Sequence, residues 1–168
     1  MPTDIRIRPV QSPELEFLEE MLFEAIFIPP GVEKPPKNII YRPELYRYVD
    51  GFGRSGDVCL VAESGGKLIA AIWTRLFTAD NKGYGFVDER TPEMGMAVVA
   101  GHRNKGIGTK LLVEMTKLLA ALDYEKVSLS VDTRNPAYRL YQRAGFLEIH
   151  ADGNSAILVR HLQENVSE

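Results

Sequence analysis

The chain has 168 residues, with 20 basic and 23 acidic side chains and a net charge of −3 at neutral pH. This length is typical of one domain with an adequate hydrophobic core, and we expect a single domain over residues 1–168. The slightly acidic balance excludes the basic surface typical of nucleic-acid-binding proteins. Residues 1–8 alternate apolar and charged side chains, so we expect neither a signal peptide nor a membrane span.

Cys59 is the single cysteine and lies in the apolar run 58–62. No disulfide can form within the chain, and a cytoplasmic location is expected because thiols persist there. Free cysteines are often simply buried, so Cys59 is expected to be a core strand residue rather than a catalytic thiol. The three histidines are scattered along the chain, and no metal site is expected.

The first half of the chain predicts a strand, two helices and a hairpin. Residues 5–10 alternate as in a strand with one buried face. Ser12 can cap a helix with Pro13 at its first position, and leucine spacing carries this helix to about Phe27. The further elements expected here are a loop over 28–42, a short helix over 42–49, strands over 58–63 and 67–77 around a turn at 64–66, and a polar loop over 78–92.

The second half predicts a strand, a helix and a strand, and then a helix with a final hairpin. The expected ranges are strand 94–99, helix 107–122, strand 126–131, helix 135–144, and strands 146–151 and 155–162 with a turn at 152–154. This order predicts a mixed α+β fold.

The segment between strand 94–99 and the following helix is basic and contains two glycines. His102, Arg103 and Lys105 precede or flank Gly106 and Gly108. Glycine lets the backbone approach a ligand closely, and the first amides of a helix have no internal partners and carry partial positive charge. A phosphate or pyrophosphate fits such a place.

Two common phosphate-binding motifs match this segment poorly. A P-loop needs Lys and then Ser or Thr directly after its second glycine, but Gly106 is followed by Ile107. A Rossmann fingerprint would need glycine at the position of Leu111, although Asp132 imitates the ribose-binding acid of that fold. A nicotinamide-nucleotide-dependent oxidoreductase therefore stays as a less favoured alternative.

Two motifs resemble those of the GCN5-related N-acetyltransferase (GNAT) superfamily. Residues 103–108, Arg-Asn-Lys-Gly-Ile-Gly, match its Arg/Gln-x-x-Gly-x-Gly/Ala loop. Residues 140–146, Leu-Tyr-Gln-Arg-Ala-Gly-Phe, resemble its helix with a Leu-Tyr pair that ends in Gly-Phe. The motifs occur in the family's order with a predicted strand between them, and the resemblance is firm over residues 58–149.

The resemblance implies an acetyltransferase that moves an acetyl group from acetyl-CoA to a primary amine of a small molecule or peptide. It implies a single N-acetyltransferase domain with a central twisted, mostly antiparallel sheet, flanked by helices and splayed at the acetyl-CoA site. No nucleic-acid or membrane partner is expected, and a homodimer is left open. A non-catalytic acyl-CoA sensor with the same fold is the main alternative, and nothing in the sequence identifies the acceptor amine.

The resemblance also implies which residues bind the cofactor. The backbone of Met96, Ala97 and Val98 is expected to bond the pantetheine arm. The residues expected to hold the phosphates, through amides and charge, are Arg103, Asn104, Lys105, Gly106, Ile107, Gly108 and Thr109. Asn135 is expected either to contact the pantetheine or, with Pro136 at the first helical position, to cap the helix.

Acyl transfer to an amine needs a base for the ammonium proton, donors for the oxyanion and an acid for the departing thiolate. By resemblance Tyr141, of the Leu-Tyr pair, is the general acid; the alternative is a core aromatic on an amphipathic helix. Glu93 stands near where several relatives carry a carboxylate facing the acceptor, and is the candidate base. A half-buried carboxylate has a raised pKa, whereas a Glu at a strand edge is usually solvated.

Overall fold

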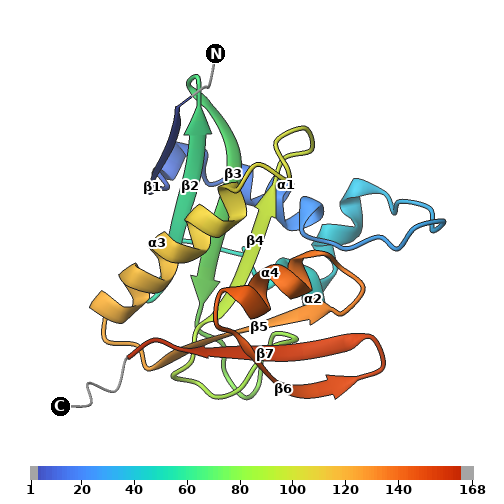
Figure 1. Ribbon diagram of the computed structural model, residues 1–168, viewed down its shortest axis with the longest axis vertical. Coiled ribbons are helices and arrows are strands. Elements are labelled where there is room, and N and C mark those ends of the chain that lie inside the picture. Colours follow the sequence, from blue (N-terminus) through green and yellow to red (C-terminus); the bar gives the residue numbers. More distant parts are fainter. Residues whose placement is uncertain (1–3, 164–168) are drawn as a thin grey trace.

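In the computed structural model, which describes residues 4–163, the chain forms one seven-stranded sheet with helices on both faces (Figure 1). The strands are β1 (Ile5–Pro9), β2 (Val58–Ser64), β3 (Lys67–Arg75), β4 (Glu93–Val98), β5 (Lys126–Asp132), β6 (Leu147–Asp152) and β7 (Ser155–His161). They lie in the order β1-β2-β3-β4-β5-β7-β6. All neighbouring strands are antiparallel except β4 and β5. The expected mixed α+β fold with a mostly antiparallel sheet is therefore confirmed.

The helices are α1 (Phe17–Glu24), α2 (Pro43–Tyr46), α3 (Ile107–Ala121) and α4 (Ala137–Arg143), with 3₁₀ turns at Ser12–Glu14 and Lys37–Tyr41. The continuous helix expected from Ser12 is wrong, because Ser12–Glu14 is a separate turn before α1. Gln11 rather than Ser12 caps it, in a capping box with Glu14. The Glu14 carboxylate also pairs with Arg8 of β1 at 2.6 Å, so this turn is held by the sheet rather than by α1.

The core lies in two layers, one on each face of the sheet. On one face α3 buries Leu111, Met115 and Leu119 completely against the strands. On the other face α1 packs against Trp73 of β3. Cys59 belongs to this second layer, and burial raises the pKa of its thiol to about 12. This confirms the expectation that Cys59 is a core strand residue.

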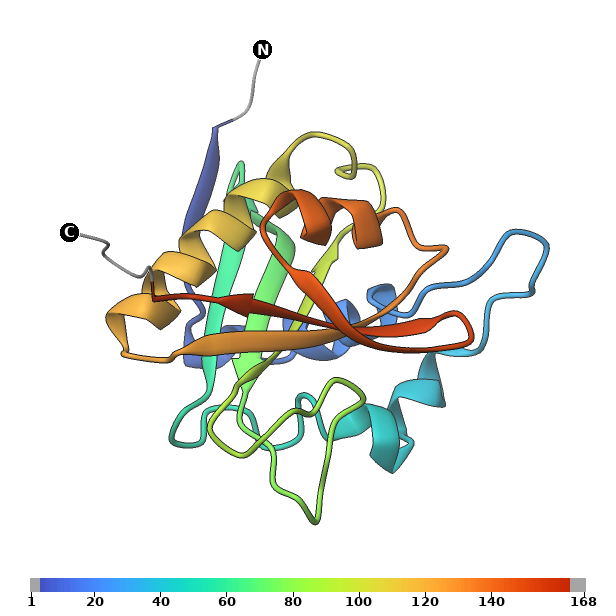
Figure 2. The same ribbon diagram turned by 60° about the horizontal axis from the view of Figure 1, so that its bottom comes forward.

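The sheet opens between β4 and β5. These two strands pair only at Glu93 and Ser128, whereas β4 stays paired with β3 as far as Val98. β5 instead follows β7 over its whole length. Figure 2 shows β5, in orange, crossing away from β4, in yellow-green. Beyond Glu93, the edge of β4 that faces β5 therefore has no neighbouring strand.

Candidate active site between the parted strands

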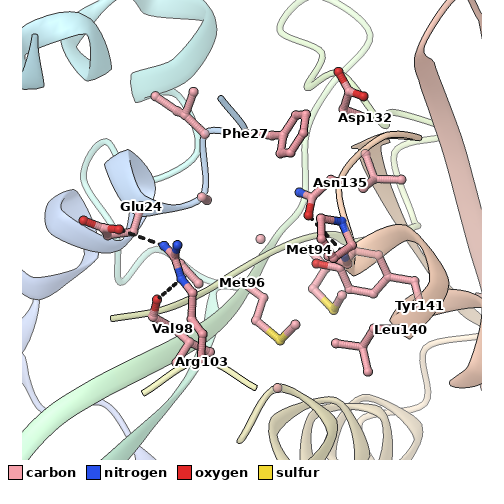
Figure 3. A pocket seen from close by; sticks show the side chains of 18 of the residues that line it. Glu24, Phe27, Met94, Met96, Val98, Arg103, Asp132, Asn135, Leu140 and Tyr141 are labelled. Atoms are coloured by element: carbon pink, nitrogen blue, oxygen red, sulfur yellow. Dashed lines mark hydrogen bonds and ion pairs between the residues drawn. The ribbon is translucent and has the colours of Figure 1, made fainter. Parts of the chain in front are cut away.

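A cleft of about 1350 Å³ occupies the opening between β4 and β5 (Figure 3). Its walls come from the end of α1 and the following loop, from β4, from the first turn of α3, and from the end of β5 with α4. Among the residues predicted from sequence, those that line the cleft are Met96, Ala97, Val98, Arg103, Asn104, Gly106, Gly108, Thr109, Asn135 and Tyr141. Glu93, Lys105 and Ile107 are not part of its lining.

The register of β4 decides which of its backbone groups face the cleft. Residues of an antiparallel strand alternate between bonding their partner strand and pointing away from it. The Val99 N–H donates to the Ile69 carbonyl of β3 at 2.8 Å, so Ala97, two residues earlier, also faces β3. Met96 and Val98 therefore direct their backbone groups toward the cleft, while those of Ala97 are used within the sheet.

The two glycines of the basic loop serve different purposes. Gly106 immediately precedes α3 with φ of 79°, and Asn104 has φ of 62°; this left-handed region favours glycine. No atom lies within 4 Å of the place where a Cβ on Gly106 would stand, so space for a ligand is open there. A Cβ on Gly108 would lie 3.3 Å from Leu140 and 3.4 Å from Met96. Gly108 therefore lets α3 pack closely against α4 and β4.

Arg103 ties three walls of the cleft together. Its Nε donates to the Val98 carbonyl at 3.0 Å, and its guanidinium pairs with the Glu24 carboxylate at the end of α1 at 2.9 Å (Figure 3). Glu24 is a site residue that the sequence patterns did not indicate, because its partner lies far along the chain. An anion that reaches Arg103 must compete with this carboxylate.

Tyr141 is packed in the core and also lines the cleft. Its side chain is 7% exposed and its ring packs against Phe146 with centroids 5.7 Å apart. It also lines the cleft opposite Arg103, with Leu140 and Met96 beside it (Figure 3). Burial raises the pKa of Tyr141 to about 12. The phenol therefore carries its proton at neutral pH and can act as a donor.

The Asn135 side chain bonds to the start of α4, which begins at Ala137 rather than at Pro136 as expected. Its side-chain oxygen accepts the Ala137 N–H at 2.9 Å and so binds the first turn of α4. The residue also lies on the cleft wall (Figure 3). Asn135 therefore links the loop after β5 to the start of α4 at the edge of the cleft.

Glu93 is buried rather than solvated. It is 2% exposed, and its Oε1 accepts a hydrogen bond from the Gly85 N–H. Burial raises the pKa of Glu93 to about 7, against the opposing effects of the Tyr48 hydroxyl, the Gly85 amide and the Arg47 charge. In this structure residues 83–85 cover the carboxylate. A carboxyl group that is half ionised near neutral pH is suited to accept a proton.

Among residues 4–163, no group of three or more His, Cys, Asp and Glu side chains is placed to hold a metal ion. None of the helices described in this range is long and apolar enough to cross a membrane.

Comparisons with known proteins agree with this geometry. A sequence model of the acetyltransferase (GNAT) family matches residues 19–146. A GNAT-family acetyltransferase from Staphylococcus aureus Mu50 has a TM-score of 0.69 at 19% identity, covering 95% of this chain and 100% of that one. The PaiA N-acetyltransferase of Thermoplasma acidophilum, solved with coenzyme A, has a TM-score of 0.66 at 20% identity, over 94% and 99%.

The Salmonella typhimurium protein yncA, solved with acetyl-CoA, has a TM-score of 0.69 at 18% identity, over 97% of this chain and 96% of that one. At these identities the likeness establishes the fold. No curated protein sequence matches the chain.

Proposed function

Because the chain belongs to the GNAT family of acetyltransferases, we propose that it transfers an acetyl group from acetyl-CoA directly to a primary amine of a small molecule or peptide. The cleft carries this proposal. It brings the unpaired edge of β4, the glycine turn before α3 and the Tyr141 side chain to one opening. A donor with a pyrophosphate at one end and a thioester at the other needs these three features.

The residues of the cleft fit acetyl-CoA. The unpaired amides of the first turn of α3, with Arg103 and Lys105 nearby, suit the pyrophosphate. The backbone groups of Met96 and Val98 suit a pantetheine arm that binds as an added strand. The open space beside Gly106 leaves room for the phosphates. When bound, acetyl-CoA supplies the activated acyl group. The amine provides the attacking nitrogen, and protein side chains stabilise the leaving thiolate and accept a proton.

Tyr141 acts on the departing sulfur. The amine nitrogen attacks the thioester carbon, the carbon–sulfur bond breaks, and the sulfur leaves as a thiolate. With a pKa of about 12, the phenol is a weaker acid than an ordinary thiol, whose pKa is about 8.5. Tyr141 therefore stabilises the forming thiolate chiefly as a hydrogen-bond donor. The proton that restores the thiol comes in the end from the amine.

Glu93 is the proposed base. An ammonium loses two protons on becoming an amide; one restores the CoA thiol and the other leaves through the base. A carboxylate with a pKa of about 7 can accept this second proton at neutral pH. Since residues 83–85 cover Glu93, the proton reaches it through a water chain or after these residues move.

The test is a broad panel of amines, monitored by release of free thiol from acetyl-CoA and longer acyl-CoAs. Amine-dependent thiol release is the expected result and also identifies the acceptor class. CoA binding without turnover by any amine would contradict the proposal and favour the sensor. Binding of a nicotinamide nucleotide in place of CoA would favour the oxidoreductase.

A further inference from the structure

The Glu93 carboxylate is enclosed by a small polar cluster beside the cleft. Its Oε1 accepts the Gly85 N–H. Its Oε2 is buried and, within the described part of the chain, makes no hydrogen bond of good geometry. Burying a carboxylate oxygen without a donor is costly. A donor next to Oε2 would therefore strongly favour the ionised form of the carboxylate.

The Tyr48 hydroxyl and Glu93 Oε2 face the same point beside Gly83. The Tyr48 hydroxyl oxygen lies 2.7 Å from the place that a Cβ on Gly83 would occupy, and Glu93 Oε2 lies 1.9 Å from it. The hydroxyl oxygen accepts the Tyr84 N–H at 2.7 Å, which leaves the hydroxyl proton for another acceptor. Burial and the Glu93 charge raise the pKa of Tyr48. The phenol thus keeps its proton and can donate it in a hydrogen bond at neutral pH.

Residues Gly83, Tyr84 and Gly85 form a cover between this cluster and the cleft. The Tyr84 N–H donates to the Tyr48 hydroxyl and the Gly85 N–H to Glu93, and Tyr84 also lines the cleft. A Cβ on Gly85 would lie 2.6 Å from Glu93 Oε1 and 2.6 Å from the Leu129 carbonyl carbon. Side chains at positions 83 and 85 would therefore push this cover away from the carboxylate.

We infer that Tyr48 is a positioning residue for Glu93: its hydroxyl donates to Oε2 and favours the ionised form of the carboxylate behind the cover. Tyr48 does not line the cleft, so it acts through Glu93 rather than on a substrate. This inference deepens the proposed function, because it rests on Glu93 as the base.

The other groups around Glu93 set the direction of the expected effect. Arg47 lowers the pKa of Glu93 by its charge. Arg75, opposite Glu93 on β3, is bound to Asp57 at 2.8 Å, and Ser128 on β5 carries no charge. Burial is the largest influence and raises the pKa of Glu93. The Tyr48 hydroxyl lowers the pKa of Glu93 and so opposes the effect of burial. Without this hydroxyl, the pKa of Glu93 should rise further.

The test compares Tyr48→Phe with Tyr46→Phe, a matched control whose hydroxyl faces Glu19 at 3.4 Å. The Gly85 amide reports ionisation of Glu93, so its ¹H–¹⁵N NMR signal is followed against pH. We expect a midpoint near 7 in the unmodified chain and in Tyr46→Phe. In Tyr48→Phe we expect a midpoint about one pH unit higher.

The unmodified protein offers an independent measurement. The Tyr48 ring carbon that bears the hydroxyl should change its ¹³C shift with the same midpoint as the Gly85 amide. A Gly85 midpoint that stays or falls in Tyr48→Phe would overturn the inference. A Tyr48 signal that remains flat through the titration would do so as well.

The pH dependence of kcat distinguishes the positioning role of Tyr48 from the proposed role of Glu93 as the base. If Glu93 is the base, the acidic limb of kcat in Tyr48→Phe moves to higher pH together with the Gly85 midpoint, and the KM for acetyl-CoA is unchanged. Glu93→Gln should then lose more activity at neutral than at high pH, where the amine is already deprotonated. A shifted Gly85 midpoint with an unshifted limb would support Tyr48 as the residue that positions Glu93 and count against Glu93 as the base.

Discussion

At the scale of single residues, the two side chains proposed to be catalytic, Tyr141 and Glu93, are both buried. Tyr141 is almost fully buried and belongs to the core that α3 and α4 share with the sheet, yet it reaches the cleft wall. Glu93 is nearly inaccessible and has a pKa displaced toward neutrality. Burial is the common cause, because a low-dielectric surrounding favours the neutral forms of both groups.

Tyr141→Phe separates the chemical role of this residue from its packing. The variant keeps the ring on Phe146, so the unfolding free energy should change little. Loss of the hydroxyl removes the hydrogen-bond donor to the forming thiolate and should lower kcat on the order of a hundredfold, while acetyl-CoA affinity stays near that of the parent chain. Turnover and CoA binding are measured on the same preparation. Full activity in the variant would leave Tyr141 a core residue only.

At the scale of elements, α3 presents its first turn to the cleft and α1 approaches the same place from the other face of the sheet. The left-handed backbone at Gly106 begins α3, and the Arg103–Glu24 pair links this loop to the end of α1. Neither helix alone makes the site. Near the end of β4 the two helices bring together the first amides of α3, the Arg103 guanidinium and the competing Glu24 carboxylate.

Gly106→Glu tests the first turn of α3. The substitution places an anion and a strained left-handed residue in the open space of the loop, so CoA binding should be lost. The parent chain should gain about 2.7 kcal/mol of stability from CoA at a hundred times its Kd, seen as a thermal shift. Gly101→Glu is the matched control, because Gly101 is also left-handed, with φ of 94°, but does not line the cleft. An equal thermal shift in Gly106→Glu and the parent would remove the loop from the binding site.

Glu24→Gln tests the competition for Arg103. The pair is partly solvated, and such pairs contribute roughly 0.2–1 kcal/mol. Freeing Arg103 should therefore lower the Kd for CoA by about fivefold at most, measured by calorimetry. Glu20→Gln removes the same charge from an exposed position on α1 and should leave the Kd unchanged. Weaker CoA binding in Glu24→Gln alone would show that Glu24 supports the donor instead.

At the scale of the whole molecule, the sheet consists of two antiparallel parts, β1–β4 and β5–β7, that meet in one short parallel contact. β4 pairs with β5 only at Glu93 and Ser128. The two core layers cover opposite faces of this sheet. If the donor binds along the edge of β4 as proposed, it adds backbone bonding where the two parts of the sheet do not pair.

Hydrogen exchange along β4 measures this directly. The amides of Met96 and Val98 face the cleft, whereas the Ala97 amide faces β3. CoA should therefore slow exchange at Met96 and Val98 and change Ala97 much less, which makes Ala97 an internal control. Equal slowing at all three residues would indicate general stabilisation rather than added bonding at the strand edge.

Local patterns in the sequence already determine much of this molecule. The apolar periodicity of α3 and the glycine-containing turns of the two hairpins predict those elements closely, because each follows from neighbours along the chain. The glycine-containing turn before α3 is also predictable from sequence, because left-handed backbone and the unpaired amides of a helix N-terminus depend on local residues. The prediction of a continuous first helix is wrong because Glu14 pairs with Arg8 on β1. Helix propensity does not take account of such a contact with a strand.

Only the tertiary structure decided what surrounds the predicted residues. The burial of Glu93, and with it a pKa near 7, depends on Tyr48 and on a cover at residues 83–85. The pairing of Arg103 with Glu24 depends on α1 and the basic loop meeting at the end of β4. Which of Met96, Ala97 and Val98 faces the cleft depends on the register with β3. Each is a contact between segments distant in sequence, so spacing along the chain indicates the reactive groups but not their environment.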